Sequence, residues 1–163
     1  MRAVVSRVSE AAVLVEGEVI GELPGPGLLV LLAITHDDGP QQAETMARKL
    51  HELRILRDGL SIADFTDGAA GLLVVSQFTL YGSTRKGRRP SFTAAARPDH
   101  AEPLVGQVVS RLRDRGATVA TGRFGATMAV HSIADGPYTV LLDVGGSSRA
   151  TNPGSGVVDE LPT

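Results

Sequence analysis

GLLVVSQFTL, residues 71–80, joins a run of four apolar residues to a polar end. A short, continuous apolar run of this kind is typical of a strand buried on both faces of a sheet. Ser76, Gln77 and Thr79 follow at the point where such a strand leaves the core, and strand ends present backbone amides and hydroxyls to ligands. The segment therefore predicts a central strand with a candidate site at its carboxyl end. The alternative is an ordinary strand end, half exposed to solvent.

Several further segments are predicted to form strands around this one. LLVLLAIT (28–35) has the same continuous apolar character and predicts a second buried strand. Other segments are rich in valine and partly alternate between apolar and polar residues, which is typical of half-buried strands. They are RAVVSRV (2–8), AAVLV (11–15), EVIGEL (18–23), TVATG (118–122), TMAVHSI (127–133) and YTVLLDV (138–144).

Two amphipathic helices are predicted on either side of the 71–80 strand. Asp38-Gly39-Pro40 supplies a capping side chain and a proline suited to a first helical turn. The first helix is expected to end near residues 57–59, and the second to span about 99–115, closed by Gly116. Apolar residues recur at steps of three and four along both. They are Ala43, Met46, Leu50 and Leu53 in the first helix, and Leu104, Val105, Val108, Val109 and Leu112 in the second.

This order of elements predicts one α+β domain over residues 1–144. Its helices would pack on a mostly antiparallel sheet or partial barrel. After Val144 the composition changes to GGSSRATNPGSGVVDELPT, which has little apolar periodicity and many turn-forming residues. Residues 145–163 are therefore expected to form a disordered tail.

Composition argues against several classes of function. The 163 residues are 42% hydrophobic and 21% charged, which is typical of a globular domain, and they include no cysteine for disulfide or thiolate chemistry. The histidines at 36, 51, 100 and 131 form no metal-binding pattern, and no phosphate loop or dinucleotide fingerprint occurs, so no metal or cofactor is expected. No apolar run approaches the roughly 20 residues of a membrane span. Without a secretory signal either, a cytoplasmic location is expected.

One dense basic run stands out in a chain whose formal net charge is −2. Because the whole chain is not basic, any contact with RNA must come from a local patch. Arg85, Lys86, Arg88 and Arg89 supply four positive charges within five residues. A solvated loop is one interpretation of this run. The other is a loop shaped by its glycine and proline whose cations contact phosphates.

Two motifs remain open to more than one interpretation from the residues alone. Ser76 lacks the flanking glycines of a nucleophile elbow, and His36 or His131 would have to approach it through the fold, so a structural hydroxyl is favoured over a catalytic serine. Asp135-Gly136-Pro137 lies between two predicted strands and favours a hairpin turn.

Taken together, these segments resemble the D-aminoacyl-tRNA deacylases. The similarity runs in order through RAVVSRVSEAAVLVEGEVIGE, LLVLLAITHDD, VVSQFTL, KGRRPSF, TGRFGATM and DGPYT, and covers residues 1 to about 144. The pair formed by SQFTL and a G-P-x-T turn about 60 residues later is specific. The resemblance implies a compact α+β homodimer with its active site at the subunit interface.

The family's SQxxT motif corresponds to Ser76, Gln77, Phe78 and Thr79. The resemblance implies that backbone N–H groups around Phe78 and Thr79 stabilise the oxyanion, with the Thr79 hydroxyl near the attacking oxygen. The 2′-hydroxyl of the RNA would assist in place of a side-chain base. Phe124 would line the pocket for the 3′-terminal adenosine, and the basic run would contact tRNA phosphates.

The family's Gly-cisPro motif corresponds to Gly136 and Pro137. By resemblance this peptide bond is cis and reaches into the partner's pocket, where its carbonyl oxygens face the α-carbon of the aminoacyl group. An L-side chain would collide with these oxygens, whereas a D-side chain would point to solvent. Arg7 would support the turn. Tyr138 departs from the smaller or non-hydroxylated residue expected after the proline.

The implied function is proofreading hydrolysis of the ester bond of D-aminoacyl-tRNA, and of glycyl-tRNA(Ala), because glycine has no side chain to collide. Two alternatives remain. One is a serine esterase with Ser76 as its nucleophile, and the other is a non-catalytic tRNA-binding module of the same fold.

Overall fold

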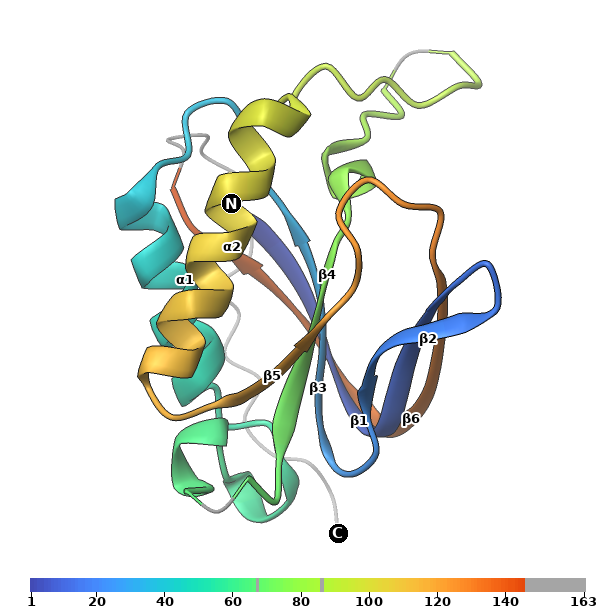
Figure 1. Ribbon diagram of the computed structural model, residues 1–163. Coiled ribbons are helices and arrows are strands. Elements are labelled where there is room, and N and C mark those ends of the chain that lie inside the picture. Colours follow the sequence, from blue (N-terminus) through green and yellow to red (C-terminus); the bar gives the residue numbers. More distant parts are fainter. Residues whose placement is uncertain (67, 86, 146–163) are drawn as a thin grey trace, which may run out of the picture.

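The computed structural model describes residues 1–66, 68–85 and 87–145 (Figure 1). Lys86 and residues 146–163 of the expected tail lie outside the described residues. In chain order the strands and helices are β1 (Arg2–Val15), β2 (Glu18–Leu23), β3 (Gly27–Ala33), α1 (Pro40–Glu52), β4 (Gly71–Ser76), α2 (Pro98–Asp114), β5 (Thr118–Thr121) and β6 (Ala129–Asp143). Short 3-10 turns are η1 (Arg57–Gly59), η2 (Ile62–Asp64) and η3 (Phe78–Tyr81). No helix in these described stretches is long and apolar enough to cross a membrane.

The strands form a single mixed sheet organised around β1. This strand pairs antiparallel with β2, β3 and β6, and the sheet continues through β3, β4 and β5 in parallel pairs. A parallel pair of strands needs a crossover segment between them. The helix α1 lies in the crossover from β3 to β4, and α2 in the crossover from β4 to β5. Gly21 of β2 passes so close to β5 that a Cβ atom there would lie 2.2 Å from the Thr121 carbonyl oxygen. The sheet therefore curls into a nearly closed barrel, which confirms the predicted α+β partial barrel with two helices.

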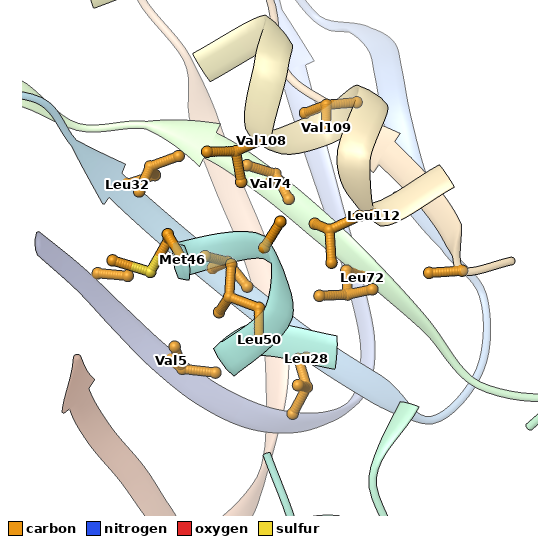
Figure 2. Close-up of a cluster of buried hydrophobic side chains, with 14 of the residues drawn as sticks. Val5, Leu28, Leu32, Met46, Leu50, Leu72, Val74, Val108, Val109 and Leu112 are labelled. Carbon is orange, nitrogen blue, oxygen red and sulfur yellow. The ribbon is translucent and has the colours of Figure 1, made fainter. Parts of the chain in front are cut away.

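The two faces of the sheet carry two apolar cores. On the outer face, α1 and α2 lie side by side and bury the larger core, which includes Met46, Leu50 and Val108 (Figure 2). The smaller core lies within the barrel, where the opposite side chains of β1, β3 and β4 meet. Because β4 is buried on both faces, its continuous apolar run is explained.

Two element ends differ from the sequence predictions by at least four residues. The first helix ends at Glu52 and not near residues 57–59, because Leu53 already has extended backbone angles. The strand predicted over residues 71–80 ends at Ser76, and the chain then turns into η3. Both differences arise at segment ends, where local propensity is weak and tertiary contacts decide.

The hairpin interpretation of Asp135-Gly136-Pro137 is wrong. Predicted strands 127–133 and 138–144 belong to one long strand, β6, which pairs along the whole of β1. Ser6 pairs with Thr139 and Val8 with Ala134, so residues 135–138 bulge out opposite Arg7. A turn and a bulge both favour glycine and proline, so local sequence does not separate them. Segments 2–8 and 11–15 likewise form one strand.

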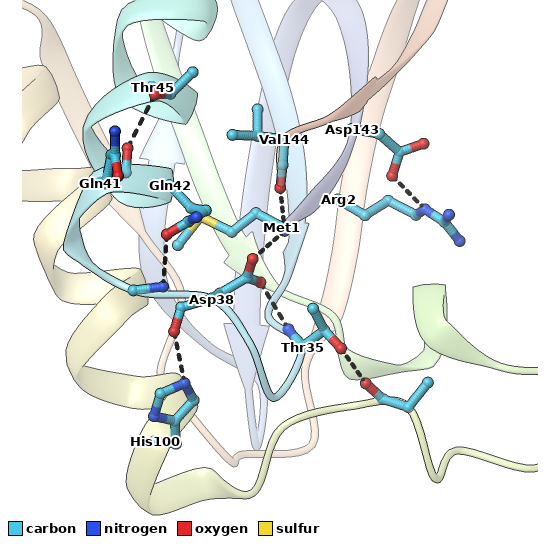
Figure 3. Close-up of polar contacts among 12 residues, drawn as sticks. Met1, Arg2, Thr35, Asp38, Gln41, Gln42, Thr45, His100, Asp143 and Val144 are labelled. Carbon is cyan, nitrogen blue, oxygen red and sulfur yellow. Dashed lines mark hydrogen bonds and ion pairs between the residues drawn. The ribbon is translucent and has the colours of Figure 1, made fainter. Parts of the chain in front are cut away.

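Asp38 does not cap α1, whose N-cap residue is Gly39. Its carboxylate instead accepts hydrogen bonds from the N-terminal ammonium of Met1, at 2.6 Å, and from the Thr35 backbone N–H, at 2.8 Å (Figure 3). The Met1 ammonium also donates to the Val144 carbonyl oxygen at 2.6 Å. This buried ion pair ties the start of β1 to the segment that leads into α1.

Candidate active site

A cavity of about 490 Å³ opens beside the carboxyl ends of β3 and β4. Its volume is in the range of small-molecule sites. Two connections enclose it, the loop between η3 and α2 and the β5–β6 connection, which meet at the same end of the molecule (Figure 1). The lining is largely apolar and includes Leu32, Ile34, Val75, Ser76, Gln77, Phe78, Phe92, Phe124 and Met128.

The turn that follows β4 shapes one wall of the cavity. The Gln77 N–H donates to the Leu32 carbonyl oxygen at 2.8 Å, which is the last link between β4 and β3. The chain then closes into η3, where Leu80 N–H donates to the Gln77 carbonyl at 3.2 Å. The N–H groups of Phe78 and Thr79 begin this turn and find no backbone acceptor in the described part of the chain. They are available to a bound ligand.

Side chains of the SQFT motif surround this turn. The Gln77 side-chain amide donates to the Thr79 hydroxyl, which holds that hydroxyl beside the exposed N–H groups. Phe78 is 59% exposed, and its ring meets Phe92 edge to face. Ser76, Gln77, Phe78 and the separately predicted Phe124 therefore lie around one cavity, with Thr79 just outside its lining.

A catalytic serine arrangement is not assembled around Ser76. Within the described residues, no hydrogen bond joins a histidine to the Ser76 hydroxyl. His36 Nε2 is instead hydrogen bonded to the Thr93 carbonyl oxygen at 2.8 Å. His131 lies on β6, opposite Ala12 of β1. The neighbourhood of Ser76 thus offers no histidine base in this structure.

The loop between η3 and α2 carries the basic run. Backbone hydrogen bonds between Ser83 and Ser91, at 2.8 and 2.9 Å, close its base. Arg85, Arg88 and Arg89 lie beyond this closure and are exposed. The loop thus presents their charges to solvent, while Phe92 at its base lines the cavity.

Arg2 connects η3 to β6, and no sequence pattern indicates this role. Its side chain donates to the Leu80 carbonyl oxygen at 3.1 Å and to the Asp143 carboxylate at 2.8 Å. The guanidinium carbon also lies 5.2 Å from the centroid of the Tyr81 ring. Burial raises the pKa of Tyr81 to about 12, and the negative charge of Asp38 adds to the rise.

Arg7 supports the 135–138 bulge from the neighbouring strand. It is largely buried, and its Nε donates to the Asp135 carbonyl oxygen at 2.8 Å. Its Nη1 donates to the Ile55 carbonyl oxygen at 3.0 Å. In the bulge the Gly136–Pro137 peptide bond is cis, and both residues are exposed.

Within one chain, the 135–138 bulge lies away from the cavity. The bulge lies opposite Arg7, which aligns through Leu28 with Leu72 of β4, four residues before Ser76. At about 3.3 Å per residue, this displaces the bulge by roughly 13 Å along the strands. Val130 of the same strand, β6, lines the cavity, and Gly136 lies six residues farther along, roughly 20 Å at this rise per residue. The two motifs are therefore well separated within a single chain.

The family model described as D-Tyr-tRNA(Tyr) deacylase matches residues 4–143. The chain belongs to this family. Relatives called D-aminoacyl-tRNA deacylase are 60% identical in Kineococcus radiotolerans and 58% identical in Streptomyces coelicolor. Each alignment covers 88% of this chain, with 99% and 100% of the respective relative. This family membership agrees with the joint presence of the SQFTL and G-P-x-T motifs.

Solved structures support the same fold for this deacylase family member. One, described as c-Myc DNA Unwinding Element Binding Protein, has a TM-score of 0.80 and 36% identity, covering 90% of this chain and 100% of that one. A second, described as a probable eukaryotic D-amino acid tRNA deacylase, has a TM-score of 0.73. At 16% identity, over 86% of this chain and 97% of that one, it shows the fold alone.

Proposed function

We propose that this member of the deacylase family hydrolyses the ester bond of D-aminoacyl-tRNA and spares L-aminoacyl-tRNA. Family membership supports the activity, and one structural observation supports the proposed site: the SQFT turn forms a wall of the cavity, and the N–H groups of Phe78 and Thr79 have no backbone acceptor in the described part of the chain. Such a substrate puts the proposed activity in the cytoplasm, where aminoacyl-tRNA is used.

The proposed reaction adds water to the aminoacyl carbonyl and breaks the bond to the ribose oxygen, which takes up a proton. The N–H groups of Phe78 and Thr79 are proposed to bind the developing oxyanion, because fixed backbone donors need no reorganisation during the reaction. The Thr79 hydroxyl, held by Gln77, would lie near the attacking oxygen. The 2′-hydroxyl of the terminal ribose would assist the proton transfer.

The cavity is proposed to hold the terminal adenosine of the tRNA. Its apolar lining suits the faces of a base, and Phe124 supplies an aromatic ring. The exposed arginines of the neighbouring loop, Arg85, Arg88 and Arg89, are proposed to contact phosphates of the acceptor end, together with Lys86. No cofactor enters this scheme.

A homodimer is proposed to complete the site. The bulge lies far from the cavity of its own chain, so its Gly136–Pro137 carbonyls would enter the cavity of a second copy. β6 forms an edge of the sheet and exposes apolar side chains, among them Ile133 at 55% and Leu141 at 66%. Exposed apolar residues on an unpaired edge are typical of an association surface.

Selection against L-amino acids is proposed to work by exclusion. Carbonyl oxygens of Gly136 and Pro137 would occupy the space that an L-side chain needs, so many D-amino acids are accepted without a fitted pocket. Glycine, which has no side chain, would escape rejection, so glycyl-tRNA(Ala) is a proposed second substrate.

Release of amino acid from D-tyrosyl-tRNA and L-tyrosyl-tRNA, measured side by side, tests this function. We expect rapid loss of the D-ester while the L-ester stays intact. Cleavage of both would leave an esterase without the proposed exclusion. Binding of both without cleavage would favour the tRNA-binding module.

A further inference from the structure

The carboxylate of Asp135 lies between two guanidinium groups at the start of the bulge. Arg57 approaches it with two donors, Nη2 at 2.5 Å from Oδ1 and Nε at 3.0 Å from Oδ2. Arg7 Nε lies 3.1 Å from Oδ2 on the other side. The side chain of Asp135 is 18% exposed and that of Arg7 9%, whereas that of Arg57 is 75% exposed. Asp135 is thus held by one buried cation and one surface cation.

The contacts close a ring that includes the segment after α1. Arg7 Nη1 binds the Ile55 carbonyl oxygen, and Arg57 follows two residues later. At the far end of the bulge, the Tyr138 ring covers the Arg7 guanidinium, with the guanidinium carbon 4.4 Å from the ring centroid. Both ends of the bulge are therefore fixed to Arg7, and one of them also to Arg57. We call Arg7, Arg57, Asp135 and Tyr138 the bulge clamp.

The 135–138 bulge can exclude an L-side chain only as strongly as the bulge resists being displaced. If an L-side chain can push the bulge aside, the discrimination equals the free energy of that movement. A bidentate arginine–carboxylate pair resists movement better than a single contact, because it fixes direction as well as distance. The Tyr138 ring over Arg7 adds a cation–π attraction and shields the guanidinium from water.

We propose that Arg57 and Tyr138 are positioning residues that hold the 135–138 bulge through Asp135 and Arg7, and thereby set how strongly L-aminoacyl esters are rejected. This inference rests on the proposed function, since it concerns the element that would exclude L-side chains. Neither residue lines the cavity or belongs to the SQFT turn. Weakening the clamp should therefore change the choice between the two esters before it changes hydrolysis of the D-ester.

The first experiment compares D-tyrosyl-tRNA and L-tyrosyl-tRNA hydrolysis in Arg57→Ala, Arg57→Lys and Asp135→Asn. Because an exposed ion pair contributes up to about 1 kcal/mol, Arg57→Ala should raise the L-to-D rate ratio by up to about five-fold. Asp135→Asn removes the charge that faces both arginines and should raise the ratio further. Arg57→Lys keeps the charge without the bidentate geometry, so its ratio should lie between those of the wild type and Arg57→Ala.

Tyr138 is tested in the same assay by two variants. Tyr138→Phe keeps the ring over Arg7 and should keep the ratio of the wild type, whereas Tyr138→Ala should raise it. The matched control is Arg48→Ala, which removes another exposed arginine with a carboxylate partner, Glu52, on α1. Its L-to-D ratio should not change.

Amide hydrogen exchange of residues 134–139, followed by mass spectrometry, measures how firmly the bulge is held and does not depend on activity. Faster exchange in Arg57→Ala than in Arg48→Ala is expected. Unchanged exchange and an unchanged rate ratio in both Arg57→Ala and Asp135→Asn would overturn the inference. A parallel fall of D- and L-hydrolysis together with the thermal midpoint would also overturn it, because that result indicates a purely structural role. A wild-type protein inactive on D-tyrosyl-tRNA would instead contradict the proposed function, while hydrogen exchange would still decide on the clamp.

Discussion

The rings of Phe78 and Phe92 meet edge to face at the cavity, with their centroids 5.2 Å apart and their planes at 75°. Phe78 belongs to the turn after β4, and Phe92 to the loop that leads into α2. Gly82 permits this contact, since a Cβ atom there would lie 2.9 Å from the Phe92 ring. The pair therefore joins the proposed oxyanion-binding turn to the loop that carries the basic run.

Loss of this ring contact should weaken hydrolysis more than folding. Aromatic pairs contribute about 0.5–1.5 kcal/mol beyond their buried area, so Phe92→Ala should lower kcat/KM for D-tyrosyl-tRNA by about two- to ten-fold. Phe92 is partly exposed, so its thermal midpoint should change little. Phe92→Leu keeps an apolar contact, so its kcat/KM should lie between those of the wild type and Phe92→Ala. Equal kcat/KM in all three proteins would show that the contact does not position the turn.

Ser76→Ala separates the proposed mechanism from the serine esterase. In the proposed mechanism the donors are backbone N–H groups, so Ser76→Ala should keep part of its activity on D-tyrosyl-tRNA. If Ser76 were the nucleophile, its replacement by alanine would instead lower kcat by more than about 10⁴-fold. Single-turnover measurements with excess enzyme decide between them, since they report the chemical step alone. Gln77→Ala, which frees the Thr79 hydroxyl, is the comparison.

Sequence patterns predicted the parts of the fold that depend on local periodicity. Leu50 and Val108 lie on the buried helix faces because apolar residues recur every three or four positions. β4 is central because its apolar run is continuous. The polar end of this strand also predicts a candidate site, and the structure has a cavity there that Ser76 and Gln77 line.

Contacts between distant segments could not be predicted in the same way. Arg57 and Asp135 lie 78 residues apart, and nothing in either segment indicates the other. Arg2 and Leu80 are likewise joined only by the fold. The bulge was mistaken for a hairpin because its pairing with β1 on both sides is a tertiary property. A sequence shows the composition of each segment, but it does not show which distant segment that segment contacts in the fold.

The basic run should make tRNA binding depend on salt. Each phosphate contact contributes a slope of about 0.7 to 0.9 in log affinity against log salt concentration. Replacing Arg85, Arg88 and Arg89 together by alanine should therefore lower that slope by about two to three units. The slope is obtained from KM for D-tyrosyl-tRNA at several salt concentrations.

A control triple variant replaces three exposed basic residues near α1, Arg48, Lys49 and Arg54, by alanine. Its slope should stay that of the wild type. Hydrolysis of D-tyrosyl-adenosine, which has no phosphates, should be unaffected in both triple variants. Equal slopes in the two triple variants would mean that the 85–89 run is an ordinary solvated loop.

The raised pKa of Tyr81 predicts a loss of stability at high pH. Burial raises the pKa of its phenol to about 12 in the folded chain, against an ordinary value of 10.0. Between these values the folded state binds more protons than the unfolded state, so the free energy of unfolding falls as the pH rises. The contribution is fully present below pH 10 and is lost as the pH rises through about 12.

Urea unfolding of the wild type and Tyr81→Phe between pH 9 and 12 measures this effect. The variant has no phenol at this position, so its free energy of unfolding should fall less steeply over the interval. Tyr138→Phe is the matched control for removing one phenol. If the wild type and Tyr81→Phe lose stability in parallel, deprotonation of Tyr81 does not limit stability there.

The proposed exchange of the bulge between subunits predicts an unusual mixing result. Pro137→Gly loosens the bulge, so this variant alone should hydrolyse both D- and L-tyrosyl-tRNA. Thr79→Ala keeps an intact bulge but loses the hydroxyl proposed near the attacking oxygen, and should be largely inactive. In a mixed dimer, the intact Thr79 of one chain faces the intact bulge of the other. An excess of Thr79→Ala protein, after subunit exchange, should therefore suppress hydrolysis of the L-ester and leave hydrolysis of the D-ester.

This suppression distinguishes a shared site from one that is complete within a single chain. Rejection restored by an inactive protein requires that the excluding bulge comes from that protein, because it supplies nothing else to the working site. A Thr79→Ala, Pro137→Gly double variant is the control, since it forms the same dimers without an intact bulge and should leave hydrolysis of the L-ester unchanged. If both inactive proteins act alike, the bulge works within its own chain. The roughly 13 Å displacement along the strands would then have to be overcome by movement of β6 itself.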